Sequence, residues 1–196
     1  MPGLAPPVAD ERTALLAFLA QQRQLLRVPA YGLTEEQAWA TPSASELSIA
    51  GLLKHAARCE RGWMDLVLRR STAPQRKADE SDAPEFLPEP GETLAGLLDD
   101  YERACAETDA AIAGIADLGQ GVPVPRGVPW FSAEIEEWSV RWVLLHLIEE
   151  TARHGGHADI IRETLDGATL FPLLAAAEQW PDPWFQPWEP AAPPAV

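Results

Sequence analysis

Four long stretches of this sequence repeat their apolar residues with the 3.6-residue period of an α-helix. They run from about residues 9 to 27, 48 to 69, 93 to 115 and 135 to 165. Two proline-rich connections, residues 71–91 and 118–130, cannot form regular helix. Strand-like alternation is almost absent, although the Val122-Pro-Val-Pro segment could be extended. The sequence therefore predicts an all-α protein built around a four-helix bundle.

Shorter features surround the four helices. Thr34 reads as the N-cap of a short extra helix over residues 34–39, with Gln37 at the reciprocal position of a capping box. The last 17 residues hold six prolines and three of the eight tryptophans. We expect the bundle to span residues 8–170, and residues 171–196 to form an extension that packs on the bundle or on a second subunit. So much aromatic surface in a 196-residue chain also favours a homodimer.

Charge and cysteine content argue against several classes of protein. A formal net charge of −15 argues against nucleic-acid binding, which needs clustered Lys and Arg. No apolar run reaches the roughly 20 residues of a membrane span, and the N-terminal residues lack the pattern of a signal peptide, so we expect a cytoplasmic protein. Cys59 and Cys105 belong to no C-x-x-C pair, and two free thiols are expected.

Three of the four histidines fall within twelve residues of the fourth helix. His146, Glu150 and His154 follow one another at i, i+4 and i+8, and His157 lies at i+11, which keeps all four within roughly 80° of one helical face. The remaining histidine, His55, lies on the second helix. Glu150 and His154, joined by His55, would give a divalent-metal site with open positions, the pattern of a catalytic site. Histidines that only cap, pack or form ion pairs are the alternative.

Several neighbouring residues have two interpretations. Trp138 and Trp142, also four residues apart, are read as core rather than as part of a cofactor site. Glu60 and Trp63 could shape a pocket near His55, or could equally be a surface acid and a core tryptophan. Cys59, one helical turn beyond His55, is read as a small buried thiol rather than as a ligand.

Two segments resemble the DinB superfamily, specifically its actinobacterial branch once labelled a domain of unknown function. Residues 47–63, LSIAGLLKHAARCERGW, look like the family pattern L-x-x-L-x-H-x-x-x-x-E-x-x-W. Residues 144–157, LLHLIEETARHGGH, look like L-x-H-x-x-x-H-x-x-x-H-x-G-Q. The resemblance implies an up-down-down-up four-helix bundle with a long crossover.

The same resemblance implies metal ligands at His55, Glu150 and His154. The common family motif has His where this chain has Glu150, but a Glu there is similar to mycothiol-dependent maleylpyruvate isomerase. His157 falls where the family has Gln, so we expect it to lie in the substrate pocket and to have a catalytic role. In an alternative register His157 replaces Glu150 as a ligand. His146 is expected to be a supporting residue.

Members of the superfamily with known activity are thiol-dependent transferases and isomerases, and the resemblance implies a function of this kind. We expect a metal-dependent thiol S-transferase or isomerase that joins a low-molecular-weight thiol, such as mycothiol, to a small electrophile. Zinc is the expected metal, with nickel, iron and manganese as alternatives. A non-catalytic DinB-like metal-binding or stress-associated protein is the second hypothesis, and a structural dimer without metal is the third.

Overall fold

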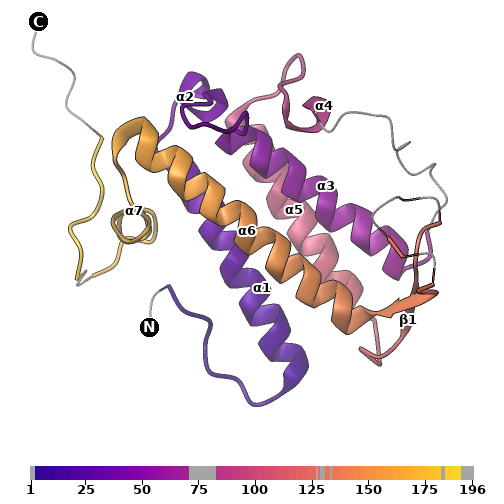
Figure 1. Cartoon of the computed structure of the whole chain (residues 1–196). Coiled ribbons are helices and arrows are strands. Elements are labelled where there is room, and N and C mark those ends of the chain that lie inside the picture. The colour runs from indigo at the N-terminus through magenta and orange to yellow at the C-terminus, as the bar shows by residue number, and fades with distance from the viewer. Residues whose placement is uncertain are drawn as a thin grey trace, which may run out of the picture.

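Four long helices form the bundle that the sequence predicts, in a computed structural model that describes residues 3–70, 83–126, 128, 131–132, 134–181 and 184–190 (Figure 1). The helices are α1 (Glu11–Arg27), α3 (Ile49–Val67), α5 (Leu94–Ala113) and α6 (Val140–Asp166). Each begins at a side chain that accepts a hydrogen bond from a backbone N–H of the first turn. These N-cap residues are Asp10, Ser48, Thr93 and Ser139.

The helix directions follow from side-chain bonds between the helices. Helix α6 runs parallel to α1, because bonds join both their beginnings and their ends. Helices α3 and α5 run parallel to each other and antiparallel to α1. The bonds between α1 and α6 are Arg141 to Glu11 (2.7 Å) and Arg162 to the Pro29 carbonyl (2.7 Å). Those between α3 and α5 or the residues just before it are Lys54 to Glu92 (2.9 Å) and Arg61 to Asp100 (2.8 Å), and Arg12 at the start of α1 bonds the Ile112 carbonyl at the end of α5 (2.9 Å). The up-down-down-up order and the crossover between α3 and α5 are therefore confirmed (Figure 1).

The bundle interior is largely apolar, and a buried ion pair joins α1 to α3. Leu19, Leu26 and Ile161 are fully buried or nearly so in its two hydrophobic clusters. Arg23 of α1 donates two hydrogen bonds to the buried Glu60 carboxylate of α3, at 2.7 and 2.9 Å. This bidentate pair leaves neither buried charge unpaired and fixes α1 against α3.

The chain enters α6 through a strand rather than through the predicted helix. Residues of β1 (Gly121–Pro123) pair antiparallel with β2 (Glu137–Ser139). The predicted start of the fourth helix near residue 135 is therefore wrong. The extended Ser139 caps the first turn of α6, so the helix begins only at Val140.

Short helices complete the fold. Helix α2 (Glu35–Trp39) carries the predicted capping box, since Thr34 and Gln37 bond reciprocally. A single 3-10 turn, η1 (Val28–Ala30), follows α1, and α4 (Ala83–Phe86) precedes α5. Helix α7 (Leu170–Ala177) was not predicted, because its apolar run is only eight residues long.

Residues after α6 lie against the end of the bundle. Leu173 and Leu174 of α7 are buried beside Val28, and Trp180 and Trp188 pack against the same cluster. The ring of Trp188 also lies under the buried guanidinium of Arg162, 4.6 Å from ring centroid to Cζ. Trp184, by contrast, is 80% exposed.

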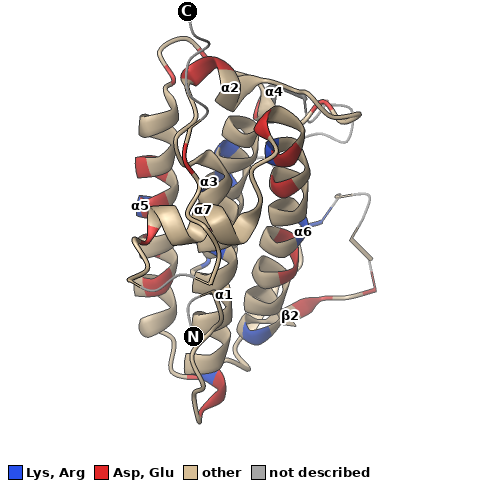
Figure 2. Cartoon of the chain, turned by 90° about the vertical axis from the view of Figure 1, so that its left-hand side faces the viewer, with Lys and Arg blue, Asp and Glu red and all other residues tan. Residues whose placement is uncertain are grey.

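In Figure 2, positions with Asp or Glu outnumber those with Lys or Arg along the helices, in keeping with the net charge of −15. Among the residues that the structure describes, no helix combines the length and apolar character required to cross a bilayer.

Candidate metal centre

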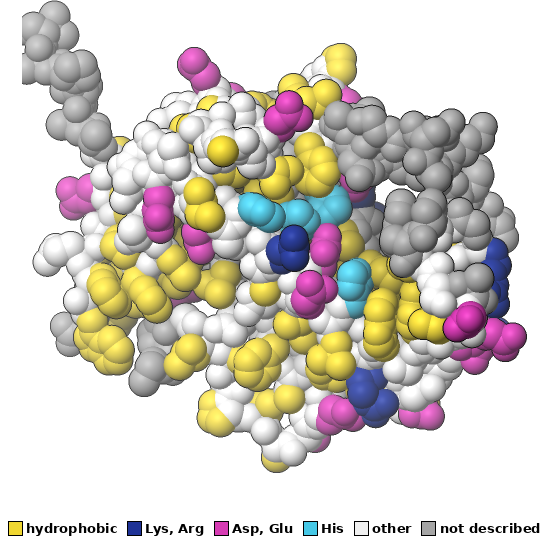
Figure 3. Space-filling view, in the orientation of Figure 1, with side chains coloured by type: hydrophobic (Ala, Val, Ile, Leu, Met, Phe, Trp, Pro, Cys, Tyr) yellow, Lys and Arg dark blue, Asp and Glu magenta, His cyan; other side chains and the backbone are white. Residues whose placement is uncertain are grey.

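The three predicted ligands meet where α3 faces α6. His55 comes from α3, and Glu150 and His154 come from α6. One donor atom of each lies within 4.8 Å of the other two. Figure 3 shows histidine side chains gathered in the middle of this face, beside acidic side chains. The i, i+4 spacing on one helix and a single histidine on its antiparallel neighbour therefore build one cluster.

Both imidazoles direct Nε2 at the same carboxylate oxygen. Nε2 of His55 lies 3.2 Å, and Nε2 of His154 3.1 Å, from Oε1 of Glu150. The two rings stand edge to face, with centroids 4.8 Å apart. All three side chains are partly buried. Two neutral imidazoles and one carboxylate are ligands that zinc, iron, nickel or manganese accepts, and three protein donors leave positions open.

A fourth residue, Glu85, orients His55, although no pattern in the sequence marks it as a site residue. Its Oε1 lies 3.0 Å from Nδ1 of His55, on the side of the ring opposite Glu150. The Phe86 ring stacks on the same imidazole at 4.8 Å and 24°. A carboxylate on the outer nitrogen fixes the tautomer and the orientation of a ligand histidine. Glu85 lies in a proline-rich, charged connection, where no helical period marks a functional position.

The segment that carries Glu85 is fastened to α3. Lys54, next to His55 in sequence, is buried and bonds the Leu87 carbonyl (3.0 Å) and the carboxylates of Glu89 (2.8 Å) and Glu92 (2.9 Å). Gly51 permits close approach, because a Cβ there would lie 2.5 Å from the Phe86 carbonyl oxygen. These contacts hold the Glu85 carboxylate at the histidine.

In the absence of metal, the charged residues of the cluster shift one another's pKa values. Burial lowers the pKa of His55, but hydrogen bonds with Glu150 and Glu85 outweigh burial and raise this pKa to about 9. Hydrogen bonds from His154 and then His55 hold the pKa of Glu150 well below its usual value. The Glu150 carboxylate is thus ionised and available as a donor at neutral pH.

His157 lies beside the cluster and His146 outside it. The His157 ring is 5.5 Å from the His154 ring. Burial first, then the charges of His154 and Arg153, lower the pKa of His157, so its imidazole is neutral at pH 7. Among the described residues, Nδ1 of His157 and Nδ1 of His154 are buried and have no hydrogen-bond partner. His146 instead approaches Glu149, at 3.6 Å, and stacks on Trp142.

The other residues singled out from the sequence are also located. Glu60 is bound to Arg23 and is buried, so it is neither a surface acid nor part of the site. Trp63 is nearly buried and contacts Trp138 and Trp142. The core interpretation is wrong for Trp142, which is 38% exposed.

Cys59 is expected to be an unreactive thiol in the metal-free protein. Burial raises its pKa to about 12, and the nearby carboxylates of Glu150, Glu60 and Glu85 act in the same direction. Because the thiolate is the nucleophile, alkylation by iodoacetamide should be very slow at pH 8 and should rise with pH without levelling off below about 12. Mass spectrometry should find no adduct on the native chain. Burial raises the pKa of Cys105 likewise to about 12, so two adducts should appear in urea. Rapid labelling of Cys59 at pH 8 would contradict this.

Glu85→Gln should weaken divalent-metal binding about 10–100-fold, the usual cost of losing a hydrogen-bond partner of a ligand histidine. The amide keeps the size of the side chain but loses the charge that orients and polarises His55. A competition titration with a chromogenic zinc chelator measures the affinity. Glu149→Gln, on the exposed side of α6, is the matched control. Equal affinities of both variants would contradict a role for Glu85.

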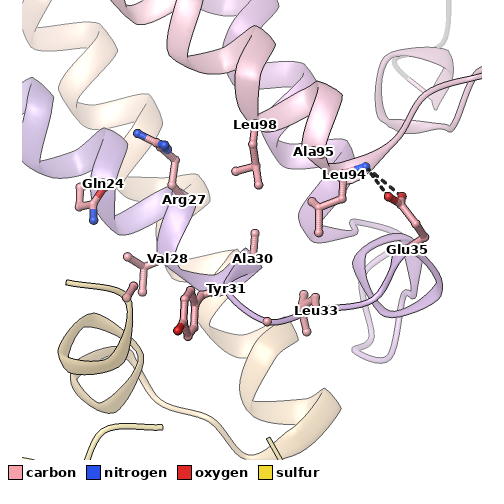
Figure 4. A pocket seen from close by; sticks show the side chains of 12 residues that line it. Gln24, Arg27, Val28, Ala30, Tyr31, Leu33, Glu35, Leu94, Ala95 and Leu98 are labelled. Atoms are coloured by element: carbon pink, nitrogen blue, oxygen red, sulfur yellow. Dashed lines mark hydrogen bonds between the residues drawn. The ribbon is translucent and has the colours of Figure 1, made fainter. Parts of the chain in front are cut away.

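A separate cavity of about 500 Å³ lies near the end of α1, beside η1, α2 and the start of α5 (Figure 4). None of the metal-centre residues lines it. Its polar side chains already have partners: Glu35 accepts hydrogen bonds from the Leu94 backbone N–H at 2.9 and 3.0 Å, and Arg27 lies 3.5 Å from Glu102. This cavity therefore adds no catalytic group to those of the α3–α6 face.

Comparison with known proteins identifies a family and a relative in fold. A family model described as mycothiol-S-transferase matches residues 14–167. The chain is similar in structure to a conserved protein from Enterococcus faecalis, with a TM-score of 0.62 and 15% sequence identity; the match covers 82% of this chain and 100% of that one. None of the curated proteins matches the chain. At 15% identity, the structural similarity shows a shared fold and does not indicate a shared function.

Proposed function

This chain belongs to the mycothiol-S-transferase family, and from that membership and the cluster of His55, Glu150 and His154 we propose that it transfers mycothiol to a small electrophile. The DinB-like resemblance of its two motif helices is thereby confirmed. The observation that carries the proposal is the convergence of two imidazole Nε2 atoms on one ionised carboxylate at a partly exposed face.

His55, Glu150 and His154 would hold one divalent metal, with zinc as the first candidate. When bound, such a metal supplies Lewis-acid activation, which lowers the pKa of a thiol that enters an open position. Glu85 and Phe86 keep the His55 ring in its orientation. No cysteine of the chain is required as a nucleophile, since burial keeps the Cys59 thiol protonated.

His157 is the proposed catalytic residue. A neutral imidazole beside the ligands can accept the proton that the thiol releases. Since Nδ1 is buried, Nε2 is the nitrogen that accepts it. His157→Ala should therefore lower the rate of thiol transfer while the metal content stays unchanged.

Initial rates of conjugation test this function. Purified protein without a histidine tag is assayed with mycothiol, glutathione and cysteine against one electrophile, before and after metal removal by a chelator. Catalysis with mycothiol that is lost on chelation and restored by metal supports the proposal. A metal-loaded protein that accelerates no thiol would favour the non-catalytic hypothesis, and isomerisation without net conjugation would favour the isomerase.

A further inference from the structure

A cluster of five rings adjoins the metal centre on α6: Trp63, Phe131 and Trp138 pack against the bundle core, whereas Trp142 remains exposed. The rings of Trp138 and Trp142 stack at 4.6 Å and 4°, and those of Trp142 and His146 at 5.3 Å and 7°. Trp63 of α3 stands edge-on to this stack, 4.7 Å from His146. Phe131 closes the other end, 4.8 Å from Trp138.

Trp142 and His146 precede the metal ligands on α6, and Trp138 lies just before that helix, in β2. Residues 138, 142, 146, 150 and 154 follow one another at intervals of four. His146 is one turn, about 6 Å, before Glu150, and Trp142 is about 12 Å before it. On the face that Figure 3 shows, hydrophobic side chains extend beyond the histidines. A small molecule that reacts at the metal centre can therefore contact the stack at the same time.

The stack is only partly covered by the chain itself. Trp142 is 38% exposed, and the His146 side chain is 26% exposed. Exposed tryptophan next to a reactive centre is costly to leave in water and favours an apolar or aromatic partner. Apolar and aromatic lining with few polar groups is also typical of sites for small organic ligands.

Charges around the stack disfavour an anionic ligand. Arg141, before Trp142, is paired with Glu11 at 2.7 Å. Arg69 at the end of α3 lies 3.8 Å from Glu137 and bonds the Gly121 carbonyl. Glu149 lies 3.6 Å from His146. A carboxylate bound at the stack itself would thus meet Glu149, while Arg141 and Arg69 are already paired.

We propose that the aromatic stack of Trp138, Trp142 and His146 binds the electrophile, and that this substrate is an uncharged molecule with an aromatic ring. The inference rests on the proposed thiol transfer, and it gives that reaction its electrophile class.

Three acrylamides with the same reactive double bond test the electrophile class. In each, the thiolate sulfur forms a bond to the terminal alkene carbon, the π bond breaks, and the adjacent carbon takes a proton from water. The proton that the thiol loses passes to His157 and from there to solvent, so the net reaction is an addition with no leaving group. The compounds are N-ethylacrylamide, N-phenylacrylamide and the carboxylate acrylamidobenzoate, each assayed with mycothiol and metal-loaded protein.

We expect kcat/KM, divided by the uncatalysed rate constant, to be highest for the phenyl compound and lowest for the carboxylate. Trp142→Ala should lower kcat/KM for the phenyl compound by about three- to tenfold, the range expected for one lost aromatic contact, and affect the ethyl compound much less. Metal content should not change. Trp184→Ala, in the exposed tail, is the matched control. Equal preference for all three compounds, or an equal loss for phenyl and ethyl, would overturn the inference.

No acceleration of any acrylamide would contradict the proposed function instead. The aromatic site then has its own test, calorimetric binding of the unreactive N-phenylpropanamide. Binding that Trp142→Ala weakens and Trp184→Ala does not would support an aromatic site. Absence of binding to the wild-type protein would overturn it.

Discussion

Replacing His154 by alanine is expected to abolish stoichiometric binding of a divalent metal while the helical content stays near that of the wild type. His154 directs Nε2 at the Glu150 oxygen that His55 also contacts, so its loss removes one of three convergent donors. The loss in affinity should exceed the roughly 10–100-fold that follows removal of an outer hydrogen-bond partner. His55→Ala should have the same effect. Metal content after dialysis, read beside the far-ultraviolet circular dichroism spectrum, measures both.

His146→Ala is the matched control. It removes an imidazole from the same helix, but one whose contacts are with Glu149 and Trp142 rather than with the ligand cluster. This variant should hold as much metal as the wild type. If His154→Ala retained stoichiometric metal, or if His146→Ala lost it, the assignment of ligands would be contradicted.

Replacing Arg162 by methionine is expected to destabilise the fold by about 3–5 kcal/mol, the usual cost of removing one partner from a buried ion pair. Arg162 is 0% exposed. Its guanidinium bonds both carboxylate oxygens of Asp166 and donates to the carbonyls of Pro29 and Tyr31, each at 2.7 Å. Methionine fills the space but leaves these acceptors without a donor. A fall in Tm of roughly 10 °C should result in a chain of this size.

Arg141→Met tests whether the burial of Arg162 is the reason for the loss of stability expected in Arg162→Met. Arg141 pairs with Glu11 with similar geometry, but both side chains are largely exposed. Solvent screens an exposed pair, which therefore contributes little to stability, so this variant should unfold almost like the wild type. Denaturant titrations of the two variants give the free energies of unfolding. Equal values for both would show that Arg162 is not the anchor we describe.

The bundle could be predicted from the sequence because local signals and tertiary packing agree there. Ser48 and Thr34 act as the N-caps expected of them. The apolar period gave the wrong start for α6, because apolar residues at helical spacing can also belong to a strand. Trp138 continues the helical period of α6, but its backbone pairs with Val122 in the small sheet. No local pattern separates these outcomes, because the pairing depends on a partner sixteen residues away.

Of the candidate site, the sequence could predict only those residues that a regular spacing on one helix, or their rarity, makes conspicuous. The Glu150 and His154 pair is visible as i, i+4, and His55 stands out because histidines are rare in this chain. Glu85 could not be found in this way, since its position depends on Lys54 fastening the segment that follows α4. The aromatic stack was visible as spaced tryptophans, but not the exposure of Trp142, which depends on how the chain folds over α6.

Zinc affinities of Glu150→Gln and His157→Ala, measured by competition titration beside the wild type, test the central claim most directly. If His55, Glu150 and His154 are the ligands, Glu150→Gln should weaken binding, because a neutral amide replaces an ionised donor. His157→Ala should leave the affinity unchanged, because its ring lies beside the cluster rather than in it. The reverse result, or a wild-type protein that binds no metal, would contradict the account.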